Sequence, residues 1–106
     1  MAVSYVNFSK STSNQESKVL SENNSHQITL EAFESSSPET TLNPSSGVVD
    51  LYYRPHGSTA YILGTTIDLS SGAKLATWGG IFTGVRLINT HGSSSLIKGD
   101  YIGWKS

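Results

Sequence analysis

Three histidines are the side chains in this 106-residue chain with the widest range of possible chemistry. A metal site would need further ligands at a spacing that orients them around the ion. His26, His56 and His91 each lack such a neighbour, and the last two are followed directly by glycine, which is typical of solvated turns. The sequence therefore predicts no metal site.

The polar residues suggest two catalytic chemistries, serine hydrolysis and glycoside hydrolysis. A triad would combine a serine with His56 and either Asp68 or Asp100, but the chain lacks the Gly-x-Ser-x-Gly turn of such nucleophiles. The acidic candidates for glycosidase chemistry are Glu31, Glu34, Asp50 and Asp68. An Asp near the end of an apolar strand more often satisfies a turn. We therefore expect no enzyme and no cofactor.

Aromatic side chains are better candidates for function than the titratable ones. Exposed rings on a flat β surface can stack on sugars or become buried between subunits. The predicted candidate binding surface consists of Tyr52, Tyr61, Trp78 and Tyr101. Core packing is the competing interpretation for Tyr53, Trp78 and Trp104, because a chain with 36% hydrophobic residues needs its large rings inside.

Short apolar segments bounded by Gly, Ser, Pro or Asn carry these candidates, which is the pattern of antiparallel strands. The predicted strands are Val3–Phe8, His26–Glu34, Val49–Arg54, Tyr61–Leu69, Leu75–Trp78, Ile81–Ile88 and Ser95–Trp104, with Lys18-Val19-Leu20 as a further short one. The segment from His26 also fits a helical spacing, although Ile28-Thr29 favours a strand. About 7–9 short strands without a crossover helix predict an all-β antiparallel β-sandwich or a small jelly roll.

Gly, Pro and Ser mark the expected turns. Residues 35–46 read as a loop, and Pro55-His56-Gly57-Ser58 is predicted to close a turn, with Pro55 at its second position if Arg54 is the first. Gly64 is placed at a β-bulge, and Gly99-Asp100 at a bulge or turn.

The length predicts one domain over residues 1–106. Residues 1–46 are polar and irregular, and residues 47–106 are denser in strand signals. Neither part alone could bury enough apolar surface to fold. The first part is a candidate for an arm that orders on a neighbouring subunit.

Charge and composition narrow the partners and the compartment. A net charge of −1 leaves no basic footprint for nucleic acid, and no apolar run approaches the roughly 20 residues that span a bilayer. The absence of cysteine rules out disulfides and thiol chemistry. With no signal peptide visible after Met1, these features favour assembly in a reducing cytoplasm.

Four short motifs follow one another in residues 48–104: Leu51-Tyr52-Tyr53-Arg54-Pro55, Ile67-Asp68-Leu69, Gly84-Val85-Arg86-Leu87 and Asp100-Tyr101-Ile102-Gly103-Trp104. With these motifs the stretch resembles a small β domain of tailed-bacteriophage virion proteins. The resemblance implies a structural protein without an active site: a capsid decoration, fibre or tail component, assembled in the host cytoplasm into the virion. Its implied partners are other virion proteins and its own copies, with a trimer favoured. The alternative function is a carbohydrate-binding or receptor-binding module that uses exposed Tyr and Trp.

Overall fold

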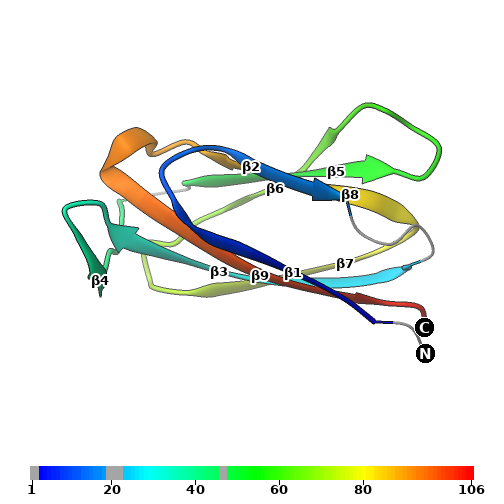
Figure 1. Cartoon of the computed structure of the whole chain (residues 1–106), viewed down its shortest axis with the longest axis horizontal. Coiled ribbons are helices and arrows are strands. Elements are labelled where there is room, and N and C mark those ends of the chain that lie inside the picture. Colours follow the sequence, from blue (N-terminus) through cyan, green and yellow to red (C-terminus); the bar gives the residue numbers. More distant parts are fainter. Residues whose placement is uncertain (1–2, 19–22, 46–47) are drawn as a thin grey trace.

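The computed structural model describes residues 3–18, 23–45 and 48–106, and it consists of two stacked antiparallel sheets (Figure 1). The strands are β1 (Val3–Ser11), β2 (Gln15–Lys18), β3 (Ser25–Glu34), β4 (Ser37–Thr41), β5 (Val49–Pro55), β6 (Ile62–Ile67), β7 (Lys74–Gly79), β8 (Phe82–Asn89) and β9 (Ser95–Trp104). A short 3₁₀ turn, Gly92–Ser94, precedes the last strand. The predicted all-β sandwich is confirmed.

The order of the strands identifies the sandwich as a jelly roll. Sheet A has the order β1-β9-β3, with β7 and β4 both pairing on the far side of β3, and sheet B has the order β2-β8-β5-β6. The antiparallel pairs β1/β9, β2/β8, β3/β7 and β5/β6 are nested within one another along the chain. A long hairpin that is folded over in this way alternates between two sheets, which is the jelly-roll arrangement.

Alternating side chains build the core between the sheets. The strand predicted over Val49–Arg54 shows this alternation in β5, because Val49, Leu51 and Tyr53 are buried while the intervening residues are only partly covered. The buried apolar residues from both sheets form one cluster: Phe8, Ile28, Leu30, Ala32, Val48, Val49, Leu51, Tyr53, Leu69, Val85, Leu87, Ile97 and Tyr101. Burying a large apolar side chain contributes about 1.5–3 kcal/mol, so this cluster is the main stabilising feature of the fold.

The polar first part of the chain, which the sequence suggested as an arm, contributes strands β1–β4 to the sandwich through its described residues, 3–18 and 23–45. Strand β3 pairs with β9 along its whole length, and Ile28 and Leu30 are completely buried. This part appears irregular in sequence because β1 and β2 are edge strands that each bury one face only. In the strand suggested at Lys18-Val19-Leu20, Val19 and Leu20 lie outside the described residues, and β2 ends at Lys18.

One prediction about loops and turns was wrong, and one was confirmed. The segment 35–46, expected to be a loop, contains β4, an exposed strand that extends a hairpin from β3 and needs few apolar residues for that reason. The predicted turn at Pro55-His56-Gly57-Ser58 is present, and Pro55 is its first position, because the Ser58 amide donates to the Pro55 carbonyl at 3.1 Å. Gly57 lies at its third position with φ +80°, a conformation that favours glycine.

The two glycines predicted at bulges have different roles. Gly64 does lie at a bulge, where the register between β5 and β6 shifts between Leu51 and Tyr52. Gly99 pairs with Leu30 of β3 without a shift, but the register with β1 shifts directly after the Phe8–Gly99 pair, so Gly99 lies beside a bulge whose extra residue is in β1. A Cβ at Gly99 would lie 3.1 Å from Leu30, so this glycine makes room for a core side chain.

Short connections decide which edges lie together. Residues 12–14 join β1 to β2, and residues 68–73 join β6 to β7, with each connection crossing from one sheet to the other. One lateral side of the sandwich is therefore formed by β1 and β2. The other is formed by β6 and β7 (Figure 1).

Candidate functional site

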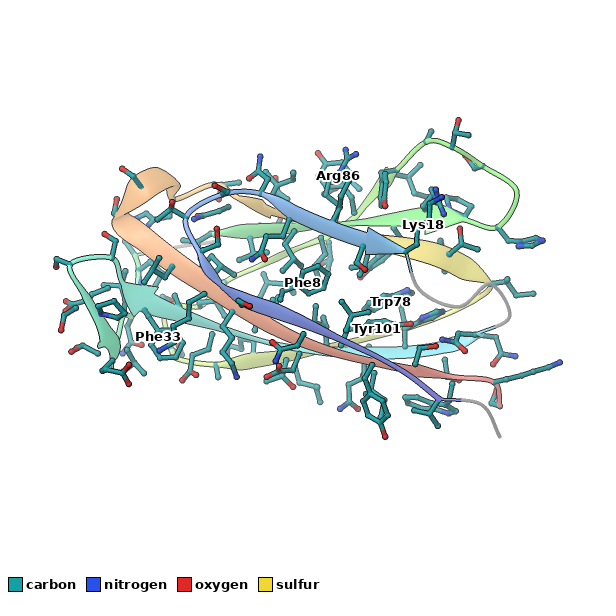
Figure 2. The ribbon with its side chains drawn as sticks, viewed as in Figure 1. Phe8, Lys18, Phe33, Trp78, Arg86 and Tyr101 are labelled. Carbon is teal, nitrogen blue, oxygen red and sulfur yellow. The ribbon has the colours of Figure 1, made fainter. Side chains whose placement is uncertain are left out.

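The four residues of the predicted binding surface do not form one surface. Tyr52 and Tyr61 lie on the outer face of sheet B, where Tyr52 pairs with Arg86 of β8. Figure 2 shows Trp78 and Tyr101 between the sheets, and Tyr101 is only 2% exposed. A surface that contains all four is therefore ruled out, because the alternation of β7 and β9 directs two of the rings inward.

Trp78 is the centre of an aromatic cluster that joins the two sheets. Its ring stacks on Tyr53 with 4.1 Å between centroids and on His26 with 5.0 Å. Phe82 and Tyr101 complete the cluster at its sides. Aromatic pairs of this kind contribute about 0.5–1.5 kcal/mol beyond the buried area, so the cluster is a structural element that holds β7 to its neighbours. Core packing is confirmed for Tyr53, which is buried, and Trp78 packs against the same core.

The buried His26 has both ring nitrogens occupied within this cluster. Its Nε2 donates to the Gly80 carbonyl at 2.9 Å, so its Nδ1 accepts from the Tyr101 hydroxyl at 2.6 Å. This arrangement requires the neutral ring. Burial lowers the pKa of His26 from its usual value, partly offset by backbone hydrogen bonds. His26 is therefore a structural residue, because its ring links β3 to Tyr101 of β9 and to the Gly80 carbonyl.

The residues considered for hydrolysis are not brought together. His56 lies in the exposed turn after β5. The Asp68 carboxylate accepts from the Ser70 backbone at 2.8 Å, and hydrogen bonds from Ser70 lower the pKa of this carboxyl. Asp100 pairs with Lys98 at 2.9 Å on the outer face of β9. In residues 3–18, 23–45 and 48–106, no group of three or more His, Asp or Glu is placed to hold a metal ion.

The ring of Tyr61 covers part of the outer face of sheet B and lies near the guanidinium groups of two arginines. The hydroxyl of Tyr61 lies over Gly84, where a Cβ would come within 2.7 Å of it. The Arg86 guanidinium lies 4.2 Å from the centroid of the Tyr61 ring, and that of Arg54 lies 6.0 Å from it. Arg86 also pairs with Glu16 of β2 at 2.7 Å. Tyr61 thereby fixes the segment before β6 onto this face.

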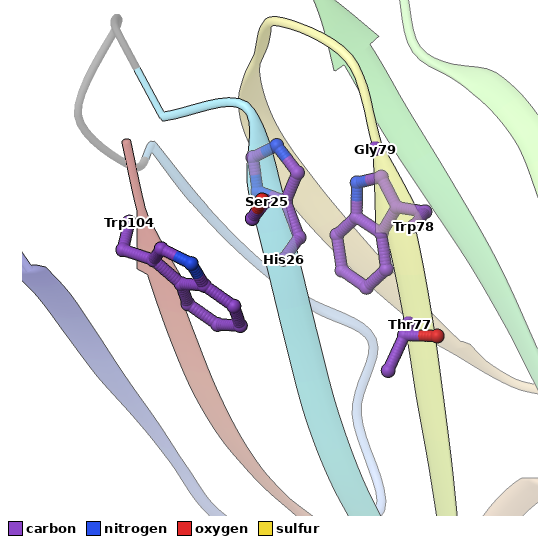
Figure 3. A pocket seen from close by; sticks show the side chains of 6 residues that line it. All are labelled: Ser25, His26, Thr77, Trp78, Gly79 and Trp104. Atoms are coloured by element: carbon purple, nitrogen blue, oxygen red, sulfur yellow. The ribbon is translucent and has the colours of Figure 1, made fainter. Parts of the chain in front are cut away.

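A shallow hollow of about 390 Å³ lies beside Trp104 (Figure 3). It is lined by Ser25, His26, Thr77, Trp78, Gly79 and Trp104. Register places Trp104, Ser25 and Gly79 in one row on the outer face of sheet A. Core packing was the competing prediction for Trp104, but β9 directs the alternate residues Tyr101 and Gly103 inward and so leaves Trp104 outside. Tyr101 and Trp104 are three residues apart in β9 and therefore face opposite sides of the strand. This odd spacing was the sequence signal for the outward placement of Trp104.

The exposed large apolar side chains gather along edge strands. They are Val3 and Tyr5 of β1, Ile62 and Leu63 of β6, Leu75 of β7, and Ile81 in the turn that follows β7. Sequence reasoning did not single out these residues, because an alternating pattern does not say which strand is at an edge. Two of them, 51% and 55% exposed, are neighbours in β6.

Comparisons with known proteins identify no family for the chain. No protein-family model matches it, and no curated protein does either. One similar solved structure is from Bacillus endospore appendages, described as a novel family of disulfide-linked pili. It is 11% identical, has a TM-score of 0.45, and the match covers 98% of this chain and 85% of that chain. Among the described residues, no helix is long and apolar enough to cross a membrane.

Proposed function

We propose that this protein is a non-enzymatic structural subunit that is held in a larger assembly by contacts with other protein subunits. The virion of a tailed bacteriophage is the proposed assembly, with the chain as a decoration, fibre or tail component. The virion part of the proposal rests on the resemblance of residues 48–104. The jelly roll is compatible with it, but a fold by itself does not assign a function.

The observation that supports an assembly role is the position of the exposed apolar side chains. Tyr5 is 75% exposed on β1, and Ile62 and Leu63 stand next to each other on β6. Scattered apolar residues on a surface need no explanation, but apolar residues on unpaired edge strands favour association with another chain. The titratable groups described above instead complete turns, surface pairs and the core.

The direct test is the molar mass of the purified protein, measured by size-exclusion chromatography with light scattering over a dilution series. An assembly role predicts an oligomer that persists at micromolar concentration, as expected for a well-packed interface of about 800 Å² per partner. A protein that elutes as an 11.4 kDa monomer at every concentration would contradict the proposal.

Carbohydrate binding is the second candidate, and the hollow beside Trp104 favours it. An aromatic ring next to the hydroxyls of Ser25 and Thr77 suits a neutral sugar ring, which presents an apolar face and a hydroxyl edge. A glycan array should then show a signal that Trp104→Ala abolishes and Tyr52→Ala leaves intact. Loss through Tyr52→Ala alone would move the site to sheet B, and no signal from the wild type would remove this function.

A further inference from the structure

We propose that the partner of this chain is a second copy of itself, joined to it through β6 so that sheet B of the two copies becomes one continuous sheet. This inference rests on the proposed assembly role and names its partner and its contact. It follows from the free edge of β6, from the lack of charge along that strand and from the register that a bulge gives it.

Strand β6 presents an edge that lacks the usual protection. Within the described residues it pairs with β5 alone, so its other side carries free backbone N–H and C=O groups. Its six residues, Ile62–Ile67, include no charge and no proline. Native proteins usually blunt such edges with lysine, proline or a covering loop. Here the preceding segment is fixed on the outer face by Tyr61, away from this edge.

The other edge strands are blunted or occupied by charged groups. Strand β2 carries Glu16 and Lys18, and β4 carries Pro38 and Glu39. Strand β7 begins with Lys74, and β1, the edge of sheet A, carries Lys10 near its end. Because β6 is uncharged, two copies of it can approach without opposing like charges. The charge pattern therefore selects β6 among the edges as the one that fits its own copy.

The bulge at Gly64 makes β6 complementary to itself. Ile62 pairs with Tyr53 and Ile67 with Val49, and both partners point into the core. Two residues five positions apart would face opposite sides of a regular strand, but the extra residue returns them to the same side. The inner face of the sheet therefore carries both isoleucines.

An antiparallel pair of β6 strands centred between Gly64 and Thr65 consequently matches face to face. Ile62 lies opposite Ile67 of the second copy on the inner side. Leu63 lies opposite Thr66 of the second copy on the outer side, because these residues pair with the outward-facing Tyr52 and Asp50 of β5. Apart from Gly64, which lies opposite Thr65 of the second copy, the pairing places apolar or hydroxyl side chains against each other. It is a two-fold contact, so it predicts a dimer in place of the trimer expected from the resemblance.

The first experiment uses charge at the centre of this contact. Thr65 is exposed and lies next to the two-fold axis, so the two copies of residue 65 come close together. Thr65→Lys and Thr65→Glu should each shift the light-scattering mass from dimer to monomer, because an inward charge at an edge opposes pairing. A one-to-one mixture of the two variants should restore the dimer. Tyr5→Lys on β1 is the matched control and should stay dimeric.

The second experiment reads the register, and it uses the absence of native cysteine. A mixture of the Leu63→Cys and Thr66→Cys variants should form a disulfide-linked dimer on mild oxidation, because opposed residues bring their Cβ atoms within reach. Leu63→Cys alone should not, because its two copies are offset by three positions, roughly 10 Å. Glu16→Cys mixed with Lys18→Cys on β2 is the control and should remain unlinked.

The outcomes separate this inference from the proposed function. Variants at Thr65 that remain folded by circular dichroism and keep the wild-type oligomeric mass overturn the β6 contact while leaving an assembly role intact. A mixture of charges that stays monomeric, or cross-linking on β2 in place of β6, also overturns it. A wild type that is monomeric at all concentrations overturns both proposals.

Discussion

The two edges of sheet B are built in opposite ways. Strand β2 pairs with β8 in unbroken register and presents Glu16 and Lys18 to solvent, with Glu16 fixed by Arg86. Strand β6 pairs with β5 through a bulge and presents isoleucine, leucine and threonine. One sheet therefore ends in a charged strand on one lateral side and an uncharged strand on the other. The difference indicates that the sandwich has one side that resists strand addition and one that permits it.

The largest effect on stability is expected at Gly64 of β6, where the absence of a side chain leaves room for the ring of Tyr53. A Cβ at Gly64 would overlap the ring of Tyr53, so Gly64→Ala should lower the free energy of unfolding by about 1–3 kcal/mol, the usual range for overpacking. Urea unfolding measures this change. Thr65→Ala, in the same strand but exposed, should change stability by less than about 0.5 kcal/mol. Equal effects of the two substitutions would contradict the described bulge.

Removing the charges from β2 should turn it into a second open edge. The double variant Glu16→Thr, Lys18→Thr is expected to form species larger than the wild-type oligomer, because both lateral sides would then permit strand addition. Light scattering at rising concentration measures this. Lys98→Thr, Asp100→Thr makes the same change of charge on β9, which lies between two strands, and should keep the wild-type mass. If both double variants behave alike, the contrast between the edges is wrong.

Acid should loosen the β6–β7 side of the sandwich first. The stack of Trp78 on His26 holds β7 to sheet A, and the pKa of His26 is lowered by burial. The unfolded chain therefore binds a proton more readily than the folded one. The contribution of neutral His26 to stability is fully present above its unfolded pKa of about 6.5 and is lost as the pH falls below that value.

Thermal unfolding between pH 7.5 and pH 5 tests this pH dependence. The wild type should lose stability on acidification, and His26→Gln, which does not titrate there, should start less stable and change less. His56→Gln, in an exposed turn, should follow the wild type. A wild type and a His26→Gln variant with parallel pH profiles would show that protonation of this ring does not matter.

The smallest effect is expected from the ion pair on β2. Glu16 and Arg86 are 2.7 Å apart, but their side chains are 55% and 37% exposed, so solvent screens the pair. Glu16→Gln should lower stability by at most about 1 kcal/mol, and the loss should shrink in high salt. Chemical unfolding at two salt concentrations measures it. A larger, salt-independent loss would mean that Glu16 contributes through packing.

Most strands were predictable from the sequence, with β4 as an exception, whereas the neighbours of each strand were not. The apolar residues Val49, Leu51 and Tyr53 alternate with other residues in the sequence, and this pattern predicted the strand β5. The structure buries these three residues on one face. The nested pairing of β1 with β9 depends on contacts between residues almost a whole chain apart. No local pattern specifies such pairs, so the sequence predicted a sandwich or jelly roll without the order of its strands.

The prediction of one binding surface was wrong because contacts with other parts of the fold decide to which side of its sheet each ring points. Tyr101 is buried because Gly103 and His26 leave space and a hydrogen-bond partner for its hydroxyl. Tyr61 lies on the outer face because Gly84 of β8 accommodates its ring. Gly84 lies on a different strand from Tyr61, so sequence spacing does not reveal that contact; Gly103 lies two residues after Tyr101 on the same face of β9, but the burial of that face is not visible in the sequence. The uncharged β6 is visible in the sequence, but only the strand order identifies it as an edge.

Hydrogen exchange of the wild-type protein at low and high concentration tests the central claim most directly. The amides of β6 that face away from β5 should exchange more slowly at high concentration, because a second copy of β6 then accepts their hydrogen bonds, while the amides of β2 should exchange at the same rate in both samples. Unchanged exchange in β6, or new protection along β2, would contradict the account.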